Sequence, residues 1–130
     1  MGMPAAKMGD TVVAIDIHII IVPAIVPIPT PLPHPFNGVL DSALSPNVHV
    51  MGLPAATLGS IAHNLPPHIP MGPGPFAKWP SNIGTIITGS PSVMVNGKPL
   101  ARVGDTALTC NDPVDLPIGT VVAVGTVLAA

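Results

Sequence analysis

The sequence predicts an all-β domain with almost no helix, and two observations carry this prediction. The 130 residues include 19 prolines and 13 glycines, and proline is excluded from helix interiors and from central strands. The windows between prolines are short and rich in Val, Ile and Thr, which favours strands. Only residues 42–44 and 104–108 retain a composition compatible with a single turn of helix.

A short motif that occurs three times predicts three pseudo-repeats within one domain, roughly 1–53, 54–98 and 99–130. Pro-Ala-Ala stands at 4–6 and 54–56 and Pro-Leu-Ala at 99–101, and each copy is followed three residues later by Gly-Asp or Gly-Ser. Self-similarity of this kind sets the architecture. A chain that repeats three times can fold with pseudo-threefold symmetry, and such a shape matches a threefold partner.

A predicted hairpin leads into the Pro-Ala-Ala motif at 54–56 and into the Pro-Leu-Ala motif at 99–101. Ser-Pro-x-Val-x-Val occupies 45–50 and 90–95, and it runs into Met-Gly at 51–52 and Asn-Gly at 96–97. Apolar residues alternating with a period of two before a glycine turn are typical of hairpins. The first motif, at 4–6, has no such hairpin before it. We expect the C-terminal strand to supply the missing strand and complete the pseudo-threefold arrangement.

The first repeat continues into the longest predicted strand, 11–22, which is β-branched almost throughout. Asp16 and His18 lie two residues apart and therefore share one face of it, while the other face is apolar. Six prolines then fall within 23–35, which predicts an extended polyproline-like segment that ends near His34. Asn37-Gly38 predicts a turn into a further strand over 39–44.

The other two repeats follow the same plan with different contents. After the second corner the sequence predicts a loop over 61–70, a Gly/Pro-rich stretch, and a strand over 84–89. After the third it predicts a loop that carries Cys110 and a strand over 119–128. The strands 84–89 and 119–125 occupy equivalent places in their repeats, since each follows the loop after a Gly-Ser or Gly-Asp corner.

Composition limits the function. Hydrophobic residues make up 48% of the chain and charged residues 8%, with a net charge of -2 and no basic cluster, so nucleic acid is not expected as a partner. The apolar stretch 11–28 contains Asp16, His18, Pro23 and Pro27 and has no cationic flank, so it is not expected to span a membrane. No signal peptide is visible. With one Trp, two Phe and no Tyr, the interior must be thin.

The histidines and the single cysteine are the candidate metal ligands. His49 stands where the third repeat has Met94, so it is interpreted as a side chain on a sheet face. The others lie between a glycine corner and the following strand, in all three repeats: His18 and His34, His63 and His68, and Cys110. Their convergence on a pseudo-threefold axis would give three histidines and a thiolate, a closed set for tetrahedral zinc. No CxxC or HExxH spacing accompanies them, and a solvated loop histidine is the plain alternative for each.

The repeated corner, with Ser-Pro-Ser-Val-Met-Val-Asn-Gly-Lys-Pro-Leu-Ala-Arg-Val-Gly-Asp over 90–105, resembles the PAAR-repeat family across essentially the whole chain. The resemblance implies a small cone-shaped β-fold that sits on a trimeric β-helical spike, with one zinc ion near its apex held by three histidines and one cysteine. Carried over residue by residue, the implied ligands are His18, His34, His68 and Cys110, with His63 as the replacement for the least secure, His18. Two departures are Ser60 in place of Asp and Leu100 in place of Ala.

The function implied by this resemblance is structural and not enzymatic. The protein, stabilised by one structural Zn²⁺, would cap and sharpen the spike of a contractile injection system, such as type VI secretion, a phage-tail-like particle or an extracellular contractile system. In this position it would aid membrane puncture and effector attachment. Expected partners are the spike trimer, effector proteins and, transiently, the target membrane. It would be assembled in the bacterial cytoplasm and delivered at the tip of the apparatus. No effector domain is expected after the last strand.

Two other functions stay open at this point. A zinc-dependent hydrolase would need an open metal position and a general base, for which Asp16 beside His18 or Asp112 beside Cys110 are the candidates. A cargo adaptor would need a separate effector as its partner.

Overall fold

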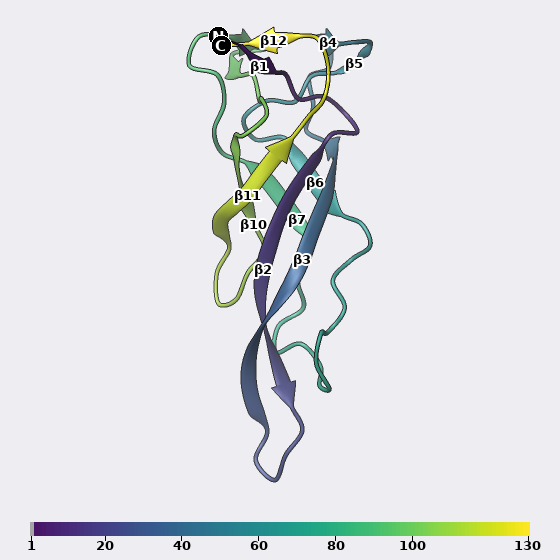
Figure 1. Ribbon diagram of the computed structural model, residues 1–130, viewed down its shortest axis with the longest axis vertical. Coiled ribbons are helices and arrows are strands. Elements are labelled where there is room, and N and C mark those ends of the chain that lie inside the picture. Colours follow the sequence, from purple (N-terminus) through teal and green to yellow (C-terminus); the bar gives the residue numbers. More distant parts are fainter. Residues whose placement is uncertain (1) are drawn as a thin grey trace.

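The computed structural model describes residues 2–130, and in this range the chain forms strands and no helix, tapering from a broad end to a narrow one (Figure 1). No helix long and apolar enough to cross a membrane occurs among these residues. The all-β prediction is confirmed. The strands are β1 (Met3–Pro4), β2 (Thr11–Val22), β3 (Ile28–Ser42), β4 (His49–Val50), β5 (Leu53–Pro54), β6 (Ile61–Asn64), β7 (Ile83–Ile86), β8 (Met94–Val95), β9 (Lys98–Pro99), β10 (Thr106–Thr109), β11 (Leu116–Val122) and β12 (Leu128–Ala129).

Three antiparallel hairpins, one from each repeat, close into a barrel. The strand order is β10-β11-β2-β3-β6-β7 and returns to β10. The hairpins are β2–β3, β6–β7 and β10–β11, and each begins directly after a glycine corner. The predicted equivalence of 84–89 and 119–125 is confirmed, because β7 and β11 are the second strands of their hairpins.

Three two-stranded ribbons form the broad end (Figure 1). Their registers are equivalent, since each opposes a repeat proline to the first residue of the partner strand: His49 to Pro54, Met94 to Pro99 and Leu128 to Pro4. The predicted hairpins are confirmed, and so is the pairing of the C-terminal strand with the start of the chain. The two termini consequently lie side by side where the other two ribbons have a turn (Figure 1).

A ring of backbone hydrogen bonds joins the three repeats just below this end. The Ala6 N–H donates to the Ala101 carbonyl (2.9 Å), Ala101 to Ala56 (2.9 Å) and Ala56 to Ala6 (3.0 Å). All three alanines are fully buried. Backbones can approach this closely around an axis only where the side chains are small, which explains the second alanine of each Pro-Ala-Ala or Pro-Leu-Ala motif.

The corners that follow the ring are equivalent in backbone and in capping. Their glycines have φ of +90° (Gly9), +93° (Gly59) and +88° (Gly104), a region that L side chains rarely adopt. At the third corner the Asp105 carboxylate accepts from the Arg102 N–H (2.7 Å) and also pairs with its guanidinium (3.1 Å). Ser60 keeps the first interaction, accepting from the Thr57 N–H (2.9 Å), and lacks the ion pair.

The proline-rich segment was predicted as a polyproline-like run followed by a turn, and both predictions are wrong. Residues 28–42 are one continuous strand paired along most of its length with β2, with Asn37 opposite Val13. The prolines fall on alternate residues, so the ladder loses no hydrogen bond to β2. Gly38 serves packing instead of a turn, because a Cβ there would lie 2.6 Å from the Phe36 ring.

Two further predictions fail at the barrel. The segments 61–64 and 106–109 were assigned to loops, and 104–108 was considered for a helical turn, yet 61–64 and 106–109 form β6 and β10. Each strand has four residues that alternate half-buried and buried. Runs this short carry little periodic signal, and pairing with neighbours from other repeats defines them.

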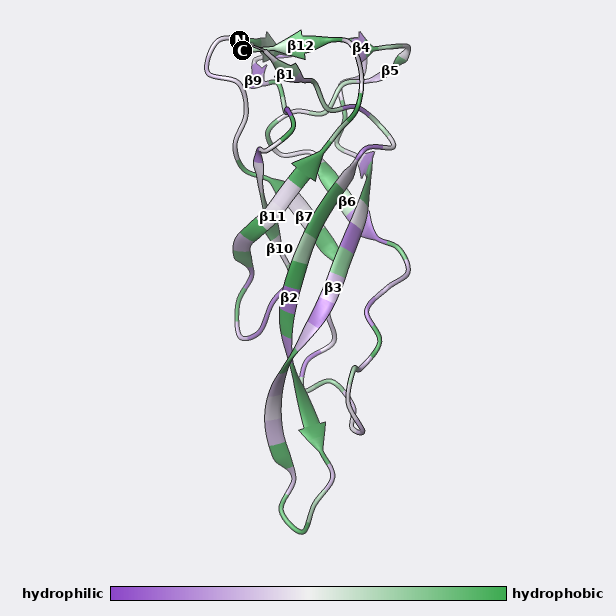
Figure 2. Cartoon of the chain, in the orientation of Figure 1, coloured by the Kyte–Doolittle hydropathy of each residue, from purple (hydrophilic) through white to green (hydrophobic). Residues whose placement is uncertain are grey.

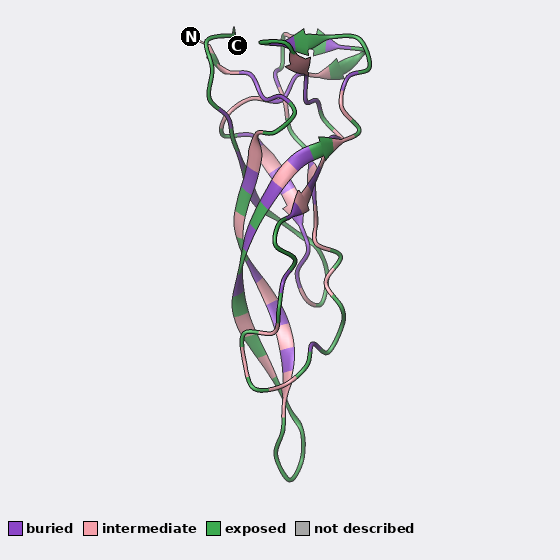
Figure 3. Cartoon of the chain, turned by 90° about the vertical axis from the view of Figure 1, so that its right-hand side faces the viewer, coloured by how far each residue is buried: buried purple, intermediate pink, exposed green. Residues whose placement is uncertain are grey.

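The core is a thin column of small and β-branched side chains along the barrel axis, as predicted from the scarcity of rings. Figure 3 shows buried positions alternating along the barrel strands and exposed ones in the loop at the narrow end. From broad end to narrow end the column contains the alanine ring, then Leu40, Ile86 and Val121, then the Phe36 ring against Gly38 and Gly84. Below Phe36 come buried polar side chains, among them Asp16, His18 and His34, and then the buried Ile20 and Phe76.

The glycine corners give the first testable prediction. Gly104→Ala should lower the free energy of unfolding by about 1–2 kcal/mol, because φ of +88° strains any residue with a Cβ, although no atom lies within 4 Å of the position that this Cβ would take. Gly104→Asn is the matched control and should lose less, since Asn tolerates positive φ better. Urea unfolding measures both, and equal losses would show that φ is not the cause.

Candidate metal centre

A buried cluster of metal-binding side chains lies inside the barrel on the narrow side of Phe36. Asp16, His18, His68 and Cys110 each offer a ligand atom, and these atoms all lie within 4.8 Å of one another. All four residues are buried. Three of the four residues predicted as ligands are therefore brought together, and an aspartate joins them.

The three repeats each supply part of the cluster. In β2 the period of two directs Asp16 and His18 inward together, so the face that carries the polar residues is the buried one. His34 lies opposite Asp16 in the β2–β3 register. His68 comes from the segment between β6 and β7, and Cys110 directly follows β10.

His34, the fourth predicted ligand, lies beside the cluster and has one unprotonated ring nitrogen. It is fully buried, and its ring centroid is 5.4 Å from that of His18 and 5.7 Å from that of His68. Nδ1 contacts the Leu32 carbonyl at 2.8 Å, and because a carbonyl only accepts, Nδ1 carries the proton. Nε2 accepts from the Met71 N–H at 3.1 Å. Burial lowers the pKa of His34 and keeps its ring neutral.

His18 has a nitrogen that no protein group satisfies. Its Nε2 is 3.6 Å from the Cys110 sulfur, while Nδ1 is buried without a hydrogen-bond partner and lies 3.6 Å from Oδ2 of Asp112. Burial, and then the neighbouring His68, lower the pKa of His18, which favours the neutral ring that a metal requires. Asp112, one of the two candidates for the general base of a zinc hydrolase, lies beside His18.

Asp16 is the hydrogen-bonding centre of the cluster, a role that the sequence analysis missed. Its Oδ1 accepts from Oγ1 of Thr109 (2.6 Å) and Nδ2 of Asn111 (3.3 Å). Its Oδ2 accepts from Nε2 of His68 (2.9 Å) and from the Cys110 thiol (3.5 Å). The sequence indicated only that Asp16 and His18, two residues apart, lie on the same face of a strand and therefore share the same surroundings.

Cys110 is a thiol in these surroundings. Burial raises its pKa from the usual 9.0 to about 11, and the neighbouring Asp16 carboxylate adds to the shift. A catalytic cysteine needs the opposite, a pKa lowered by a base or a cation. A bound metal would displace the thiol proton and hold the thiolate.

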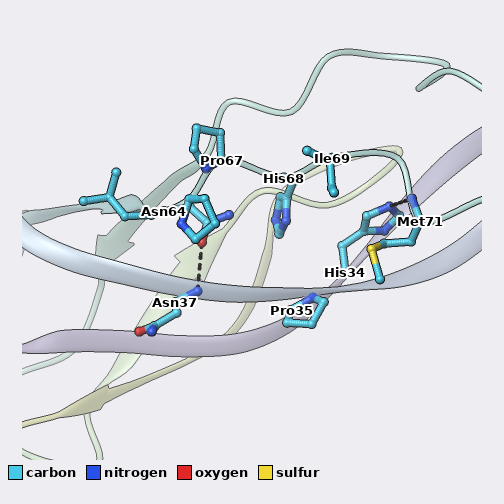
Figure 4. Close-up of a pocket in the computed structure, with 10 residues that line it drawn as sticks. His34, Pro35, Asn37, Asn64, Pro67, His68, Ile69 and Met71 are labelled. Carbon is cyan, nitrogen blue, oxygen red and sulfur yellow. Dashed lines mark hydrogen bonds between the residues drawn. The ribbon is translucent and has the colours of Figure 1, made fainter.

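A cavity of about 300 Å³ adjoins the cluster between β3 and the segment after β6. Figure 4 shows His34 and His68 on its wall, together with prolines and the Asn37–Asn64 contact, in which the Asn37 N–H donates to the Asn64 side chain (2.9 Å). The two histidines therefore border this cavity.

The remaining two histidines lie elsewhere. His63, the replacement considered for His18, is half-buried, and its Nδ1 contacts Oδ1 of Asp41 at 2.6 Å. It belongs to β6 but not to the cluster. His49 is exposed on β4 at the position that Met94 occupies on β8, as the interpretation of it as a sheet-face residue requires.

The donor set fits zinc. Imidazole nitrogens with one thiol sulfur are the donors that structural zinc sites use, His18 and His34 are held neutral, and the unpartnered Nδ1 of His18 lies inside the same buried volume. The carboxylate of Asp16 provides the negative charge that a buried cation with a single thiolate still needs.

Comparison with known proteins adds a family. Residues 77–128 match the family model described as PAAR motif. The matched range includes the third hairpin, the third glycine corner and Cys110, while the clustered histidines precede it. No curated protein and no solved structure matches the chain.

The buried thiol predicts a pH dependence of the metal-free protein. The folded state holds the Cys110 proton more tightly than the unfolded chain does, because its pKa is about 11 against 9.0. This stabilisation is complete below pH 9.0 and is lost as the pH rises through about 11. Urea unfolding across this window should show the loss, and Cys110→Ala should lack that part of it. Parallel curves for the two proteins would contradict the prediction.

Proposed function

Because the chain is a PAAR-repeat protein, we propose that it caps and sharpens the spike of a contractile injection system, held together by one structural zinc ion. The observation that carries the proposal is the threefold broad end. Three ribbons in equivalent register surround a three-membered hydrogen-bond ring, so one chain presents the same backbone pattern three times to a trimer.

The broad end has the chemistry of a docking face. Each ribbon exposes large apolar side chains there, namely Met3, Met51, Met94 and Leu128. The ribbons are two-stranded, and their outer edges offer backbone groups for pairing. A trimeric β-helical spike would cover both, because its end also presents strands in threefold arrangement.

Zinc would supply the stability that the thin core does not. We propose His18, His34, His68 and Cys110 as its ligands and Asp16 as an outer partner that orients His68. The oxygens of Asp16 accept hydrogen bonds from four side chains. Nε2 of His34 is unprotonated and accepts a single hydrogen bond, from the Met71 N–H, which zinc would replace. The zinc ion with one thiolate would carry one positive charge, which the Asp16 carboxylate neutralises within the buried site.

A fully protein-ligated zinc ion in this site would be structural. A hydrolase would need a metal position open to water, and the raised pKa of Cys110 disfavours a cysteine nucleophile. The proposal also includes assembly in the cytoplasm, delivery at the tip of the apparatus and attachment of separate effectors. Binding of the threefold broad end to the spike would direct the narrow end away from the spike.

The zinc proposal predicts one zinc per chain by elemental analysis. Cys110→Ser should lose the metal and lower the melting temperature by roughly 10 °C or more. His34→Ala should weaken zinc binding more than about 100-fold in chelator competition, while Asp16→Asn keeps the stoichiometry with a smaller loss. His63→Ala, outside the cluster, is the control and should bind normally. Zinc kept by His34→Ala and lost by Asp16→Asn would make Asp16 the fourth ligand instead.

The docking proposal predicts that charge at the broad end blocks spike binding. Met94→Asp combined with Leu128→Asp should weaken pull-down by the trimeric spike protein of the same system more than about tenfold, because each carboxylate would be buried unpaired. Val114→Asp, exposed on the loop after β10, is the control. Normal zinc content would show that both proteins are folded. Unchanged binding by the double variant would exclude this face.

A further inference from the structure

We propose that the narrow end of the molecule is a lipid-inserting tip, which takes the hydrocarbon of a target bilayer as its ligand. The tip is the far part of the β2–β3 hairpin, residues 19–31, called here the distal ribbon. It extends beyond the barrel and ends in the loop between the two strands (Figure 1). The proposal rests on the spike-tip function and assigns membrane contact to one element.

The distal ribbon is uncharged and exposes large apolar side chains. No Lys, Arg, Asp or Glu occurs between Asp16 and Asp41. Ile25 is fully exposed, and Val26 and Ile28 are exposed by 72% and 53%. Figure 2 shows the loop between β2 and β3 coloured as hydrophobic. These side chains contribute nothing to the core, and their chemistry is complementary to hydrocarbon.

The backbone of the distal ribbon is also suited to an apolar medium. The prolines of β3 lie opposite Ile19 and Ile21 in the register, at positions whose nitrogens point away from β2. That outer edge therefore has no N–H donors there. On the other edge, the Ile21 N–H donates to the Pro75 carbonyl (2.9 Å) and the Ile19 carbonyl accepts from Ala77 (2.8 Å). Unsatisfied donors, which oppose entry into lipid, are thus few.

The same edge argues against a protein strand as the occupant. Addition of a partner strand needs alternating donors and acceptors along the exposed edge. Pro29, Pro31 and Pro33 remove the donors from the free edge of β3. The side chains at the loop remain as the binding surface, and they suit a fluid apolar phase better than a pairing partner.

The free part of the distal ribbon is nearly as long as one leaflet is thick. The bridge between Ile20 and Phe76 and, one residue further out, the hydrogen bond from the Ile21 N–H to the Pro75 carbonyl (2.9 Å) mark the level at which the rest of the chain pairs with the ribbon. Ile25 lies four positions beyond Ile21, and at ~3.3 Å per residue this step extends at most about 13 Å, because β2 ends at Val22. This is slightly less than half of the ~30 Å hydrocarbon thickness of a bilayer.

An aromatic and a cationic side chain lie near the level of that bridge. Trp79 is 80% exposed, and its ring centroid is 5.8 Å from that of Phe76. Lys78 beside it is also exposed. Tryptophan and lysine favour the boundary between hydrocarbon and headgroups. Insertion of the ribbon to its full length would place both residues at that boundary.

The test uses the zinc-loaded full chain and vesicles of phosphatidylcholine, with and without phosphatidylglycerol. Trp79 is the only tryptophan, so its emission reports the local environment directly. We expect co-flotation with vesicles and a blue shift, with little dependence on anionic lipid because the ribbon is uncharged. Ile25→Ser combined with Val26→Ser should reduce the bound fraction at least about tenfold. Val114→Ser with Val124→Ser, two exposed valines elsewhere, should leave it unchanged.

Three outcomes would overturn the proposal: no flotation of the unsubstituted protein, equal losses in both double variants, or a self-association that the Ile25/Val26 substitutions abolish. Zinc content and spike pull-down, measured on the same samples, separate this proposal from the spike-tip function. A protein that binds zinc and spike but not vesicles loses only the lipid-inserting tip. A protein that binds vesicles but neither zinc nor spike loses the spike-tip function on which the proposal rests.

Discussion

The ring of three backbone hydrogen bonds between Ala6, Ala56 and Ala101 is the constraint on which the rest of the structure depends. It joins residues far apart in the sequence, so the three repeats must come together before any of them is complete. Each repeat leaves the ring through a glycine corner into a barrel hairpin, and each enters it from a ribbon of the broad end. The ring therefore sets the direction of both ends of the molecule.

The close approach of the three backbones at the ring also explains the position of the metal centre. An axis lined by alanine admits little apolar volume, and Phe36 fits below only because Gly38 and Gly84 leave space for its ring. Beyond that ring the hydrophobic column ends, and the barrel is filled by Asp16, His18 and their neighbours. Buried polar groups need partners, and the unpartnered nitrogen of His18 shows that the protein atoms alone do not satisfy this set.

The sequence predicted the parts that are local and repeated. The motif spacing predicted the hairpins and the pairing of β12 with β1. Position within the repeats predicted that candidate ligands from all three repeats would meet, and the family resemblance selected the set that includes His18, His68 and Cys110. The sequence did not predict β6 and β10, whose four residues become strands through partners from other repeats. The alternating prolines of β3 resembled a polyproline segment in the sequence. They are compatible with a β-ladder only in the register in which they pair with β2, and the sequence does not reveal that register. Asp16 was missed as a centre because its partners Thr109 and Asn111 come from another repeat.

The molecule departs from threefold symmetry in one place, and that departure makes it pointed. Only the first repeat has a long hairpin, with strands of 12 and 15 residues against 4 and 4, and 4 and 7, in the others. Three equal hairpins would end together and give a blunt cylinder. With one extended hairpin, the cross-section falls from the six strands of the barrel to the two of β2 and β3. The threefold symmetry suits the broad end, which would meet a trimer. At the opposite end the symmetry is lost, and a single two-stranded ribbon is the narrowest structure that still pairs its own backbone.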